Sequence, residues 1–416
     1  MPEPYRIRVV EPLPFVTLRT RRRVIKAAGY NPFLLPAKYV MIDLISDSGT
    51  GAMTTHQWAA MLRTREDFAG QESYEEFTKQ ARRLTGFSYI QPVHQGRSAE
   101  NILFKILLKP GDVVLANTHF ETTRGNIEAL GCRAVDLPSD EPPFLGNIDI
   151  TRLKKSLMSN KAVRMVILTC TNNIKGGQPV SLENITETGQ ITQKHGIPLI
   201  LDASRFADNA YLIKEHSRLG VGVKTICQRM FAAADIVYLS CKKDGLVNIG
   251  GFIGMRSRRL YDKLINEVIR QEAYPTSGGL AARDIAAMSL GLVDALHEDF
   301  LRAHISSVRY LAEVLKKNDV RIIEPVGGHA VVVMPRKGHR YFSFALAAQV
   351  FLKTGVRGGV FEECFRLAIP RRVYTKDQLR YAGESIASLY GSELPGLRLV
   401  NRPREFFNFR ARFTRS

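Results

Sequence analysis

An alternation of short apolar runs with longer amphipathic segments, spanning residues 113–243, is the feature that most constrains the fold. Four runs have the length of buried strands, at residues 113–117, 164–169, 197–201 and 236–239. The segments at residues 183–195 and 222–233 have the apolar spacing of helices. Strands that alternate with helices favour a parallel sheet covered by helices on both faces. We therefore predict an α/β fold with a doubly wound, mostly parallel sheet.

Polar residues follow these strands at their carboxyl ends, where the ligands of such sheets bind. Asp202 comes directly after one strand, and Ser240-Cys241-Lys242-Lys243 ends the next. A buried ammonium loses hydration and tends to become neutral, which is the form that attacks a carbonyl. We interpret Lys243 as the residue that forms a Schiff base with pyridoxal phosphate. The alternative is a strand that simply surfaces at its two lysines.

Two polar turns are further candidates for ligand contacts. Gln95-Gly96-Arg97-Ser98 precedes an apolar-periodic helix at Asn101–Leu108, with Ser98 as its expected cap. Its free backbone N–H groups and guanidinium would form an anion site. Asp47-Ser48-Gly49-Thr50 follows the strand Ile42–Ile45 and would let the backbone approach a ligand closely. A plain capped helix start and an ordinary turn are the alternatives.

The length of 416 residues, 45% of them hydrophobic, is sufficient for one large domain and a smaller one. We expect a large domain at residues 46–296 and a small α+β domain formed by residues 1–45 and 297–416, because chain termini tend to lie on one domain. Helices are expected at Arg258–Gln271, Ala281–Leu296, Leu301–Lys317, Ala345–Thr354 and Lys376–Tyr390. Strands are expected at Val320–Glu324 and Ala330–Pro335, and a loop at Thr118–Thr123.

The formal net charge of +19 favours anionic partners in general. Basic residues are dense in Arg19–Arg23 and from Arg402 to Arg415, but no nucleic-acid-binding motif surrounds either cluster. We interpret both clusters as solvated surface and expect no nucleic-acid partner. No apolar run approaches the length of a membrane span, so no membrane partner is expected either.

Cysteine usage and the first residues of the chain bear on its compartment. Five cysteines lie far apart with no CxxC pair, which suggests neither a zinc site nor a disulfide framework. The first residues lack the basic and then apolar pattern of a signal peptide. Together these features favour a protein of the reducing cytoplasm.

Taken together, the motifs resemble those of the tryptophanase and tyrosine phenol-lyase family of pyridoxal phosphate enzymes, the β-eliminating lyases. The resemblance runs nearly end to end through Pro4-Tyr5-Arg6-Ile7, Asn31-Pro32-Phe33-Leu34-Leu35, Asp47-Ser48-Gly49-Thr50, His94-Gln95-Gly96-Arg97, Gly176-Gly177-Gln178-Pro179-Val180-Ser181, Arg205 with Asp208-Asn209-Ala210-Tyr211, Lys242-Lys243-Asp244 and Arg366-Leu367-Ala368-Ile369-Pro370-Arg371. It implies the type I fold of pyridoxal phosphate-dependent transferases, similar to aspartate aminotransferase. It also implies a homo-oligomer, a dimer or a tetramer, in which active sites share residues across an interface.

The resemblance further implies a role for each matching residue. Lys243 would hold the cofactor and take the Cα proton, and Asp202 would pair with the pyridine nitrogen. The other cofactor contacts would come from Gln95, Gly96, Arg97, Phe120, Asn173, Arg205 and Ser240. Arg366, helped by Ser48, would bind the substrate carboxylate. A potassium ion is held in the family by positions that match Gly49, Glu66 and Asn248.

The chain departs from the family where the pocket would face the leaving group. Phe68 replaces a tyrosine thought to protonate the leaving group, and a phenyl ring cannot donate a proton. Glu121 stands where the phenol-lyases have threonine and the tryptophanases have aspartate. A further leaving-group position falls at about Asn408. A longer segment that covers the substrate in the family is shortened around residues 355–366.

These departures predict a pyridoxal phosphate-dependent lyase that cleaves the β-substituent of an amino acid other than tyrosine or tryptophan. A thiolate or other good leaving group needs less acid assistance than a phenol or an indole carbon, so Phe68 would be tolerated. The alternatives are β-replacement or retro-aldol chemistry in a biosynthetic pathway and, from a different class, a non-catalytic basic binding protein. The presence of Lys243, Asp202 and Arg366 together argues against the last.

Overall fold

The computed structural model describes residues 2–361 and 363–416, which form two compact units. The large unit comprises residues 48–173 and 177–301, and the small unit comprises residues 1–47, 174–176 and 302–416. We expected the boundaries at residues 46 and 297. The chain changes unit at residues 48 and 302 instead, and it also contributes Ile174–Gly176 to the small unit.

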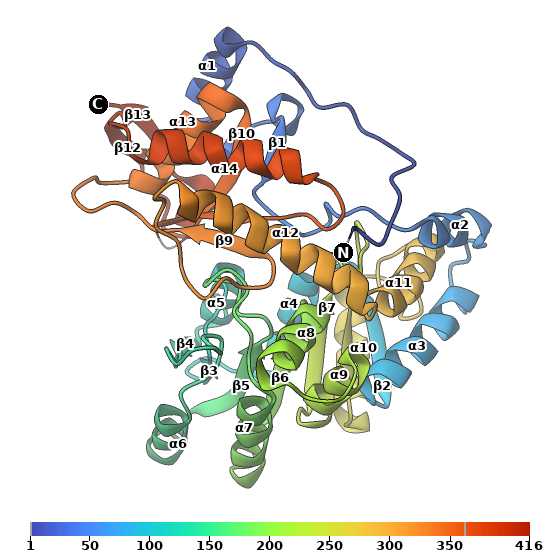
Figure 1. The fold of residues 1–416 in the computed structure, drawn as a ribbon. Coiled ribbons are helices and arrows are strands. Elements are labelled where there is room, and N and C mark those ends of the chain that lie inside the picture. Colours follow the sequence, from blue (N-terminus) through green and yellow to red (C-terminus); the bar gives the residue numbers. More distant parts are fainter. Residues whose placement is uncertain (1, 362) are drawn as a thin grey trace. The chain divides into compact units, whose positions relative to one another are not determined.

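The described residues of the large unit form a seven-stranded sheet of order β2-β8-β7-β6-β5-β3-β4 (Figure 1). Its strands are β2 (Tyr89–Val93), β3 (Val113–Ala116), β4 (Arg133–Asp136), β5 (Val163–Thr169), β6 (Leu199–Asp202), β7 (Ile236–Ser240) and β8 (Gly251–Met255). The strands β3 to β7 pair in parallel, and β8 runs antiparallel to both of its neighbours. The predicted α/β fold with a mostly parallel sheet is confirmed.

Successive residues of each strand are buried on opposite faces of this sheet. Leu199 and Leu201 of β6 belong to one buried cluster, whereas Ile200 belongs to the other, together with Ile236 and Tyr238 of β7. This alternation follows from the two-residue period of a strand. Because both faces are covered, the strands read in the sequence as continuous apolar runs.

Helices cover both faces of the sheet in the large unit. The face that buries Ile200 is covered by α4 (Gly96–Leu107), α5 (Glu121–Glu128) and α10 (Arg258–Gln271). The opposite face is covered by α3 (Glu72–Thr85), α6 (Ile150–Ser159), α7 (Leu182–Lys194), α8 (Phe206–Ser217), α9 (Val223–Ala232) and α11 (Ala282–Asp294). Helix α2 (Thr55–Arg63) packs on α11.

The small unit contains a four-stranded sheet of order β1-β10-β11-β9 among its described residues. Strand β1 (Ile42–Leu44) runs parallel to β10 (Val356–Phe361), and β10, β11 (Cys364–Ala368) and β9 (Ala330–Val333) are antiparallel in turn. The other elements are α1 (Leu18–Ala27), the short helices η1 (Pro32–Leu34) and η2 (Ala37–Tyr39), α12 (Glu298–Lys317), which begins in the large unit, α13 (Phe342–Thr354), α14 (Lys376–Tyr390), β12 (Leu397–Asn401), α15 (Phe407–Arg410) and β13 (Arg412–Arg415).

One predicted element of the small unit is wrong. Residues 320–324 form no strand among the described residues, and only Ile322 makes a bridge, to Val333. The pairing ends there because Pro325 has no backbone N–H with which to continue a ladder. A buried ion pair strengthens this unit elsewhere: Arg371 Nη1 lies 3.1 Å from Asp47 Oδ2, with both side chains almost fully buried. No helix in the described part of the chain has both the length and the apolar character needed to cross a membrane.

Candidate active site

The carboxyl ends of β6 and β7 bring two predicted cofactor residues onto neighbouring strands. Asp202 ends β6 and lies opposite Tyr238 of β7 in the parallel register. A chain of hydrogen bonds joins the two strand ends, because Ser240 N–H donates to Ser204 Oγ at 3.1 Å and Ser204 Oγ–H donates to Asp202 Oδ1 at 2.7 Å. The carboxylate of Asp202 is thereby held in place beside the end of β7.

The turn that carries Lys243 is fixed to the start of α8. Asp244, which is buried, accepts hydrogen bonds on Oδ2 from Ala207 N–H at 2.7 Å and from Asp208 N–H at 3.2 Å. A carboxylate at a helix N-terminus is stabilised by the free N–H groups and the helix dipole. Lys243 itself is half-buried. The backbone on either side of this lysine is therefore anchored, while its side chain is not fully enclosed.

The predicted anion site lies at the start of α4, five residues earlier than the helix that we expected from Asn101. The predicted cap at Ser98 is wrong, because its hydroxyl donates to Glu272 and Gln95 occupies the N-cap position without a side-chain hydrogen bond. The first turn contains no acidic residue. Its backbone N–H groups therefore remain without a side-chain cap, as an anion site requires.

Gly96 allows this helix start to approach the end of β7. A Cβ atom at Gly96 would lie 2.7 Å from Ser240 Cβ and 3.1 Å from Ser240 N, so no other residue fits there without a shift of the backbone. Gly251 is restricted in the same way, because its Cβ would lie 3.0 Å from Gly96 N. The start of α4 and Ser240 thus form a close cradle, with Arg97 exposed beside it.

Glu100, which sequence reasoning did not single out, is a buried carboxyl on the same helix, only 6% exposed. Its Oε1 accepts hydrogen bonds from Thr123 Oγ1 at 2.7 Å and from the hydroxyl of Tyr238 at 3.2 Å, and its Oε2 accepts one from Asn126 Nδ2 at 3.2 Å. Burial, and secondarily the charge of Asp202, raises the pKa of Glu100 to about 7. A buried carboxyl with a raised pKa therefore lies close enough to Asp202 to be affected by its charge.

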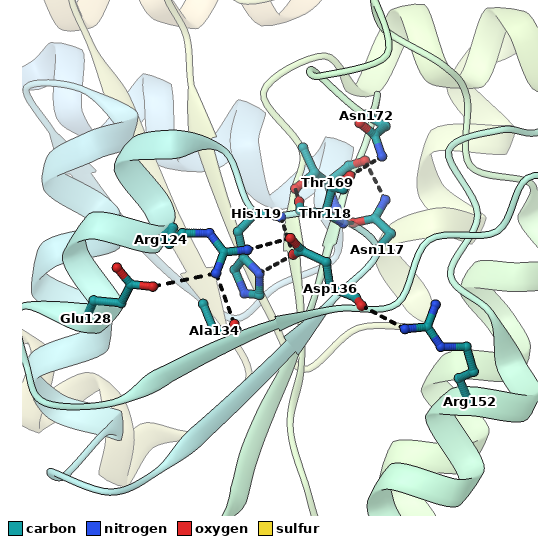
Figure 2. A network of polar contacts seen from close by, with 10 residues as sticks. All are labelled: Asn117, Thr118, His119, Arg124, Glu128, Ala134, Asp136, Arg152, Thr169 and Asn172. Atoms are coloured by element: carbon teal, nitrogen blue, oxygen red, sulfur yellow. Dashed lines mark hydrogen bonds and ion pairs between the residues drawn. The ribbon is translucent and has the colours of Figure 1, made fainter. Parts of the chain in front are cut away.

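Figure 2 shows the contacts that hold the turn before α5. His119 N–H donates to Asp136 Oδ1 at 2.8 Å, and His119 Nδ1 lies 2.6 Å from the same oxygen. Arg124 binds the other carboxylate oxygen of Asp136 and donates to Ala134 O at 3.0 Å. Burial lowers the pKa of His119 below its ordinary value, so the imidazole is neutral at pH 7 and donates from Nδ1. Its Nε2 is buried without a hydrogen-bond partner among the described residues.

A second set of contacts in Figure 2 ties this turn to β5. Asn117 Oδ1 accepts from the N–H groups of Thr118 and Thr169, each at 3.0 Å, and Asn117 Nδ2 donates to Thr169 O at 3.2 Å. Asn172, beyond the end of β5, donates to the hydroxyl of Thr118. The loops after β3 and β5 are thus held together by side chains from each.

This bonded turn presents Phe120 and Glu121, both half-buried. The predicted loop at Thr118–Thr123 is partly wrong, because α5 begins at Glu121 with Phe120 as its N-cap. Glu121 lies in the first turn of α5, where its negative charge stabilises the helix by interacting with the helix dipole. The sequence pattern alone did not show that a helix begins at this residue. Two further predicted residues lie past neighbouring strands: Asn173 follows β5, and buried Arg205 donates its backbone N–H to Cys170 O at 3.2 Å.

The predicted potassium ligands of the large unit make contacts of their own. Asn248 Nδ2 donates to Gly49 O at 3.0 Å. Glu66 accepts from the backbone N–H groups of Ala282 at 2.7 Å and Arg283 at 3.3 Å, so it caps α11. No group of three or more His, Cys, Asp or Glu side chains suited to a metal occurs among the described residues. Potassium binding stays a prediction.

Phe68 is 80% exposed, with its ring 5.7 Å from that of Tyr274. Ser48 is half-buried at the first position of the large unit. The other two predicted substrate contacts belong to the small unit. Arg366 of β11 is 4% exposed, with its guanidinium carbon 4.1 Å from the centre of the Phe361 ring. Asn408 of α15 is half-buried, and its backbone carbonyl accepts from Asn31 Nδ2 at 3.0 Å.

Comparison with known proteins identifies the family. The sequence matches the family described as Beta-eliminating lyase over residues 43–384. It is 41% identical to a protein named probable tryptophanase from Aeropyrum pernix, over 97% of this chain and 94% of that protein. The chain belongs to the β-eliminating lyase family. It is also 37% identical to a protein named tyrosine phenol-lyase from Pasteurella multocida, over 99% of this chain and 98% of that protein.

The solved structures agree on the fold of this β-eliminating lyase. A double mutant of Thermus thermophilus aspartate aminotransferase superposes with a TM-score of 0.64 at 15% identity, covering 91% of this chain and 97% of that one. The predicted type I fold is therefore confirmed. Family and fold together make the chain a pyridoxal phosphate-dependent lyase that carries out β-elimination.

The residues of the large unit fit the cofactor of this family. The cofactor has a phosphate, which needs free N–H donors, and the uncapped start of α4 beside Ser240 supplies them. It has a pyridine nitrogen, which needs an acidic partner, and Asp202 is held at the end of β6. It has an aldehyde, which needs an amine, and Lys243 follows the end of β7. Each chemical requirement is met at the carboxyl edge of a single sheet.

Proposed function

We propose that this β-eliminating lyase removes the β-substituent of an amino acid that is neither tyrosine nor tryptophan, releasing pyruvate and ammonia. The observation that carries this proposal is the pair of residues at the predicted leaving-group end of the pocket. Phe68 has no proton to donate, and Glu121 stands where the resemblance gives threonine in the phenol-lyases and the shorter aspartate in the tryptophanases. The cofactor residues, by contrast, all match the family.

In the proposed reaction Lys243 would hold the cofactor and would take the Cα proton of the substrate. When bound, the cofactor would supply an electron sink for the pair left on Cα. Asp202 would keep the pyridine nitrogen protonated, and its carboxylate is oriented by the hydroxyl of Ser204. Burial, and secondarily Arg97, lowers the pKa of Lys242, the amine nearest in sequence to the proposed base.

The remaining cofactor contacts follow from the positions of the side chains. Gln95, Gly96, Arg97 and Ser240 lie at the start of α4 or the end of β7 and would hold the phosphate. The ring of Phe120 would stack on the pyridine, at the N-cap of α5. Asn173 and Arg205 would lie near the phenolic oxygen of the cofactor. Arg366 of the small unit and Ser48 of the large unit would bind the substrate carboxylate, and Asn408 of the small unit would face the side chain.

The leaving group departs without help from residue 68, so it must be a good one or must take a proton from elsewhere. Glu121, which is half-buried, would solve this in one of two ways. It protonates the leaving group itself, or it binds a cation or a hydrogen-bond donor on the substrate side chain. Both solutions exclude a substrate whose side chain is purely apolar.

The exposed apolar side chains of the large unit support the proposed oligomer. Trp58, Leu62 and Phe68 are 51%, 86% and 80% exposed. Large apolar groups exposed in this number are typical of a surface that another chain covers. We propose that the enzyme is at least a dimer and that Phe68 lies near the active site of a neighbouring subunit. Glu66, Gly49 and Asn248 would bind a potassium ion in this assembly.

A screen of amino acids tests the function. The purified enzyme, loaded with pyridoxal phosphate, is incubated with each amino acid, with O-substituted serines and with S-substituted cysteines. Pyruvate and ammonia are then measured. The proposal expects both products from a substrate with a heteroatom leaving group and little from tyrosine or tryptophan. Efficient turnover of tyrosine or tryptophan would refute the proposed specificity. Light scattering at micromolar concentration tests the oligomer, and an active monomer would contradict it.

A further inference from the structure

The positive charge of this protein is concentrated in the small unit. That unit contains 30 of the 59 Lys and Arg residues but only 13 of the 40 Asp and Glu residues, a net charge of +17 in 165 residues. The large unit contains 29 basic and 27 acidic residues, a net charge of +2 in 251 residues. The excess charge is therefore a property of one part of the molecule and not of the chain as a whole.

Helix α1 presents a stripe of cations on one face. Its members occupy positions i, i+3, i+4 and i+7 and are all exposed: Arg19, Arg22, Arg23 and Lys26. Residues with this spacing lie along one side of a helix. Val24 and Ile25 of the same helix are buried, so its apolar side packs within the small unit. The stripe is thus the solvent-facing side of an amphipathic helix.

The β12–β13 hairpin lies beside the C-terminal end of α1 (Figure 1). Phe413 N–H donates to Gly29 O at 2.8 Å, and Arg412 Nη1 donates to Ala27 O at 3.0 Å. The approach is so close that a Cβ atom at Gly29, whose φ is +59°, would lie 2.9 Å from Arg412 Cβ. The hairpin and its loop add six exposed arginines: Arg398, Arg402, Arg404, Arg410, Arg412 and Arg415. We call these six residues and the α1 stripe the basic face.

The cations of the basic face have few counter-charges. Across residues 2–361 and 363–416, none of the ten lies within ion-pair distance of a carboxylate. Helix α1 contains no acidic residue, and the segment from residue 397 to the C-terminus contains only Glu405. Like charges at i and i+4 destabilise a helix, and so does a cation in its first turn. This arrangement therefore does not serve the stability of the unit itself.

We propose that the basic face binds the phosphate backbone of a nucleic acid, independently of base sequence. Nine of the ten cations are arginines, whose planar fork matches the oxygens of a phosphate. A helix of 10 residues is about 15 Å long. One strand of a duplex carries a phosphate every ~3.4 Å, so about four phosphates span that length, as many as the cations of the α1 stripe.

The other polyanionic partners fit less well. A helix that binds a membrane surface inserts its apolar side, but the apolar side of α1 is already buried. Our expectation of no nucleic-acid partner rested on two basic clusters taken separately. Some 380 positions separate them in the sequence, and the fold brings the hairpin of one against the C-terminal end of the helix of the other. The proposal concerns the small unit alone and does not depend on the substrate of the lyase.

Fluorescence anisotropy of a labelled DNA duplex of about 20 base pairs tests the proposal on the holoenzyme between about 50 and 200 mM salt. The variant Arg19→Gln/Arg22→Gln/Arg23→Gln/Lys26→Gln should bind at least about tenfold more weakly at the lower salt. Its plot of log K against log salt should be shallower by about 3.6 units, since four phosphate contacts are lost and each removes roughly 0.9. Arg398→Gln/Arg402→Gln/Arg404→Gln should weaken binding in the same direction.

The matched control removes the same four charges from exposed lysines of the large unit: Lys155→Gln/Lys161→Gln/Lys194→Gln/Lys224→Gln. It should change affinity by less than about twofold. The α1 variant should keep lyase activity and show an equal or higher thermal midpoint, because it loses like-charge pairs. Equal losses in the two quadruple variants, no duplex binding at low salt, or binding only to vesicles of phosphatidylserine and phosphatidylcholine would overturn the proposal.

Discussion

Replacement of Glu100 by glutamine should make the stability of this enzyme less sensitive to pH. The carboxyl faces Asp202 from β6, Tyr238 from β7, and Thr123 and Asn126 from α5. Burial raises its pKa from 4.5 to about 7. In this range the folded protein binds a proton that the unfolded chain has lost, so the free energy of unfolding falls as the pH rises from about 4.5 to about 7.

The size of the effect follows from the shift. A difference of about 2.5 pKa units, at about 1.4 kcal/mol each, corresponds to roughly 3 kcal/mol of stability lost by the wild type between pH 4.5 and pH 8. Glutamine has no proton to lose. Its oxygen can accept from Thr123 and Tyr238 as before, and Asn126 can turn its amide to accept from the new NH2 group.

The assay is denaturant unfolding of the cofactor-free protein at pH 5 and pH 8, compared between wild type and Glu100→Gln. The stability of the variant relative to wild type should rise by about 2–3 kcal/mol between the two values, whatever the baseline cost of the substitution. Glu183→Gln, at an exposed site in the first turn of α7, is the matched control. Infrared difference spectra should show a protonated carboxyl band that is absent from the variant. If wild type and Glu100→Gln differed in their free energy of unfolding by the same amount at pH 5 and at pH 8, a raised pKa of Glu100 would be ruled out.

Three further predictions test the site and the fold. Asp202→Ala should weaken retention of pyridoxal phosphate, because the pyridine nitrogen loses its acidic partner; equilibrium dialysis showing unchanged affinity would contradict this. Glu121→Gln should reduce kcat/KM on the true substrate far more than Phe68→Tyr does, and Phe68→Tyr should not create useful tyrosine cleavage; near-wild-type kinetics for Glu121→Gln would disprove the proposed role. Arg371→Ala should destabilise the small unit by about 3–5 kcal/mol, since it removes the cation that lies 3.1 Å from the buried carboxylate of Asp47; a denaturation midpoint within error of wild type would contradict this.

Much of the fold followed from periodicity. Lys376–Tyr390 and Arg258–Gln271 form helices with the predicted bounds, because each has a clear apolar stripe and an N-terminal cap, Thr375 or Ser257. The polar residues after β6 and β7 were also recognisable, since a charge that ends a buried strand is rarely there for packing. The strand predicted at residues 320–324 failed because a short apolar run does not reveal whether a partner strand continues beside it.

The parts that sequence reasoning missed depend on contacts between distant residues. Ser98 is a residue type that often caps a helix, but its hydroxyl donates a hydrogen bond to Glu272, 174 positions away in the sequence. Glu100 was visible only as an acidic residue inside an apolar helix face, and its partner Tyr238 lies on β7. The basic face combines residues from both ends of the chain, so the sequence of either cluster alone could not predict that the two lie together. Local patterns predict elements, whereas the pairings between them are set by the fold.

The most direct test of the account locates the amine that holds pyridoxal phosphate. The purified holoenzyme is reduced with borohydride and digested, and the pyridoxyl-labelled peptide is sequenced by mass spectrometry. The account predicts a visible absorbance band that reduction removes, with the label on Lys243, and neither band nor label in Lys243→Ala. A label on Lys242, or a band and label that persist in Lys243→Ala, would contradict the assignment of Lys243 as the residue on which the lyase reaction depends.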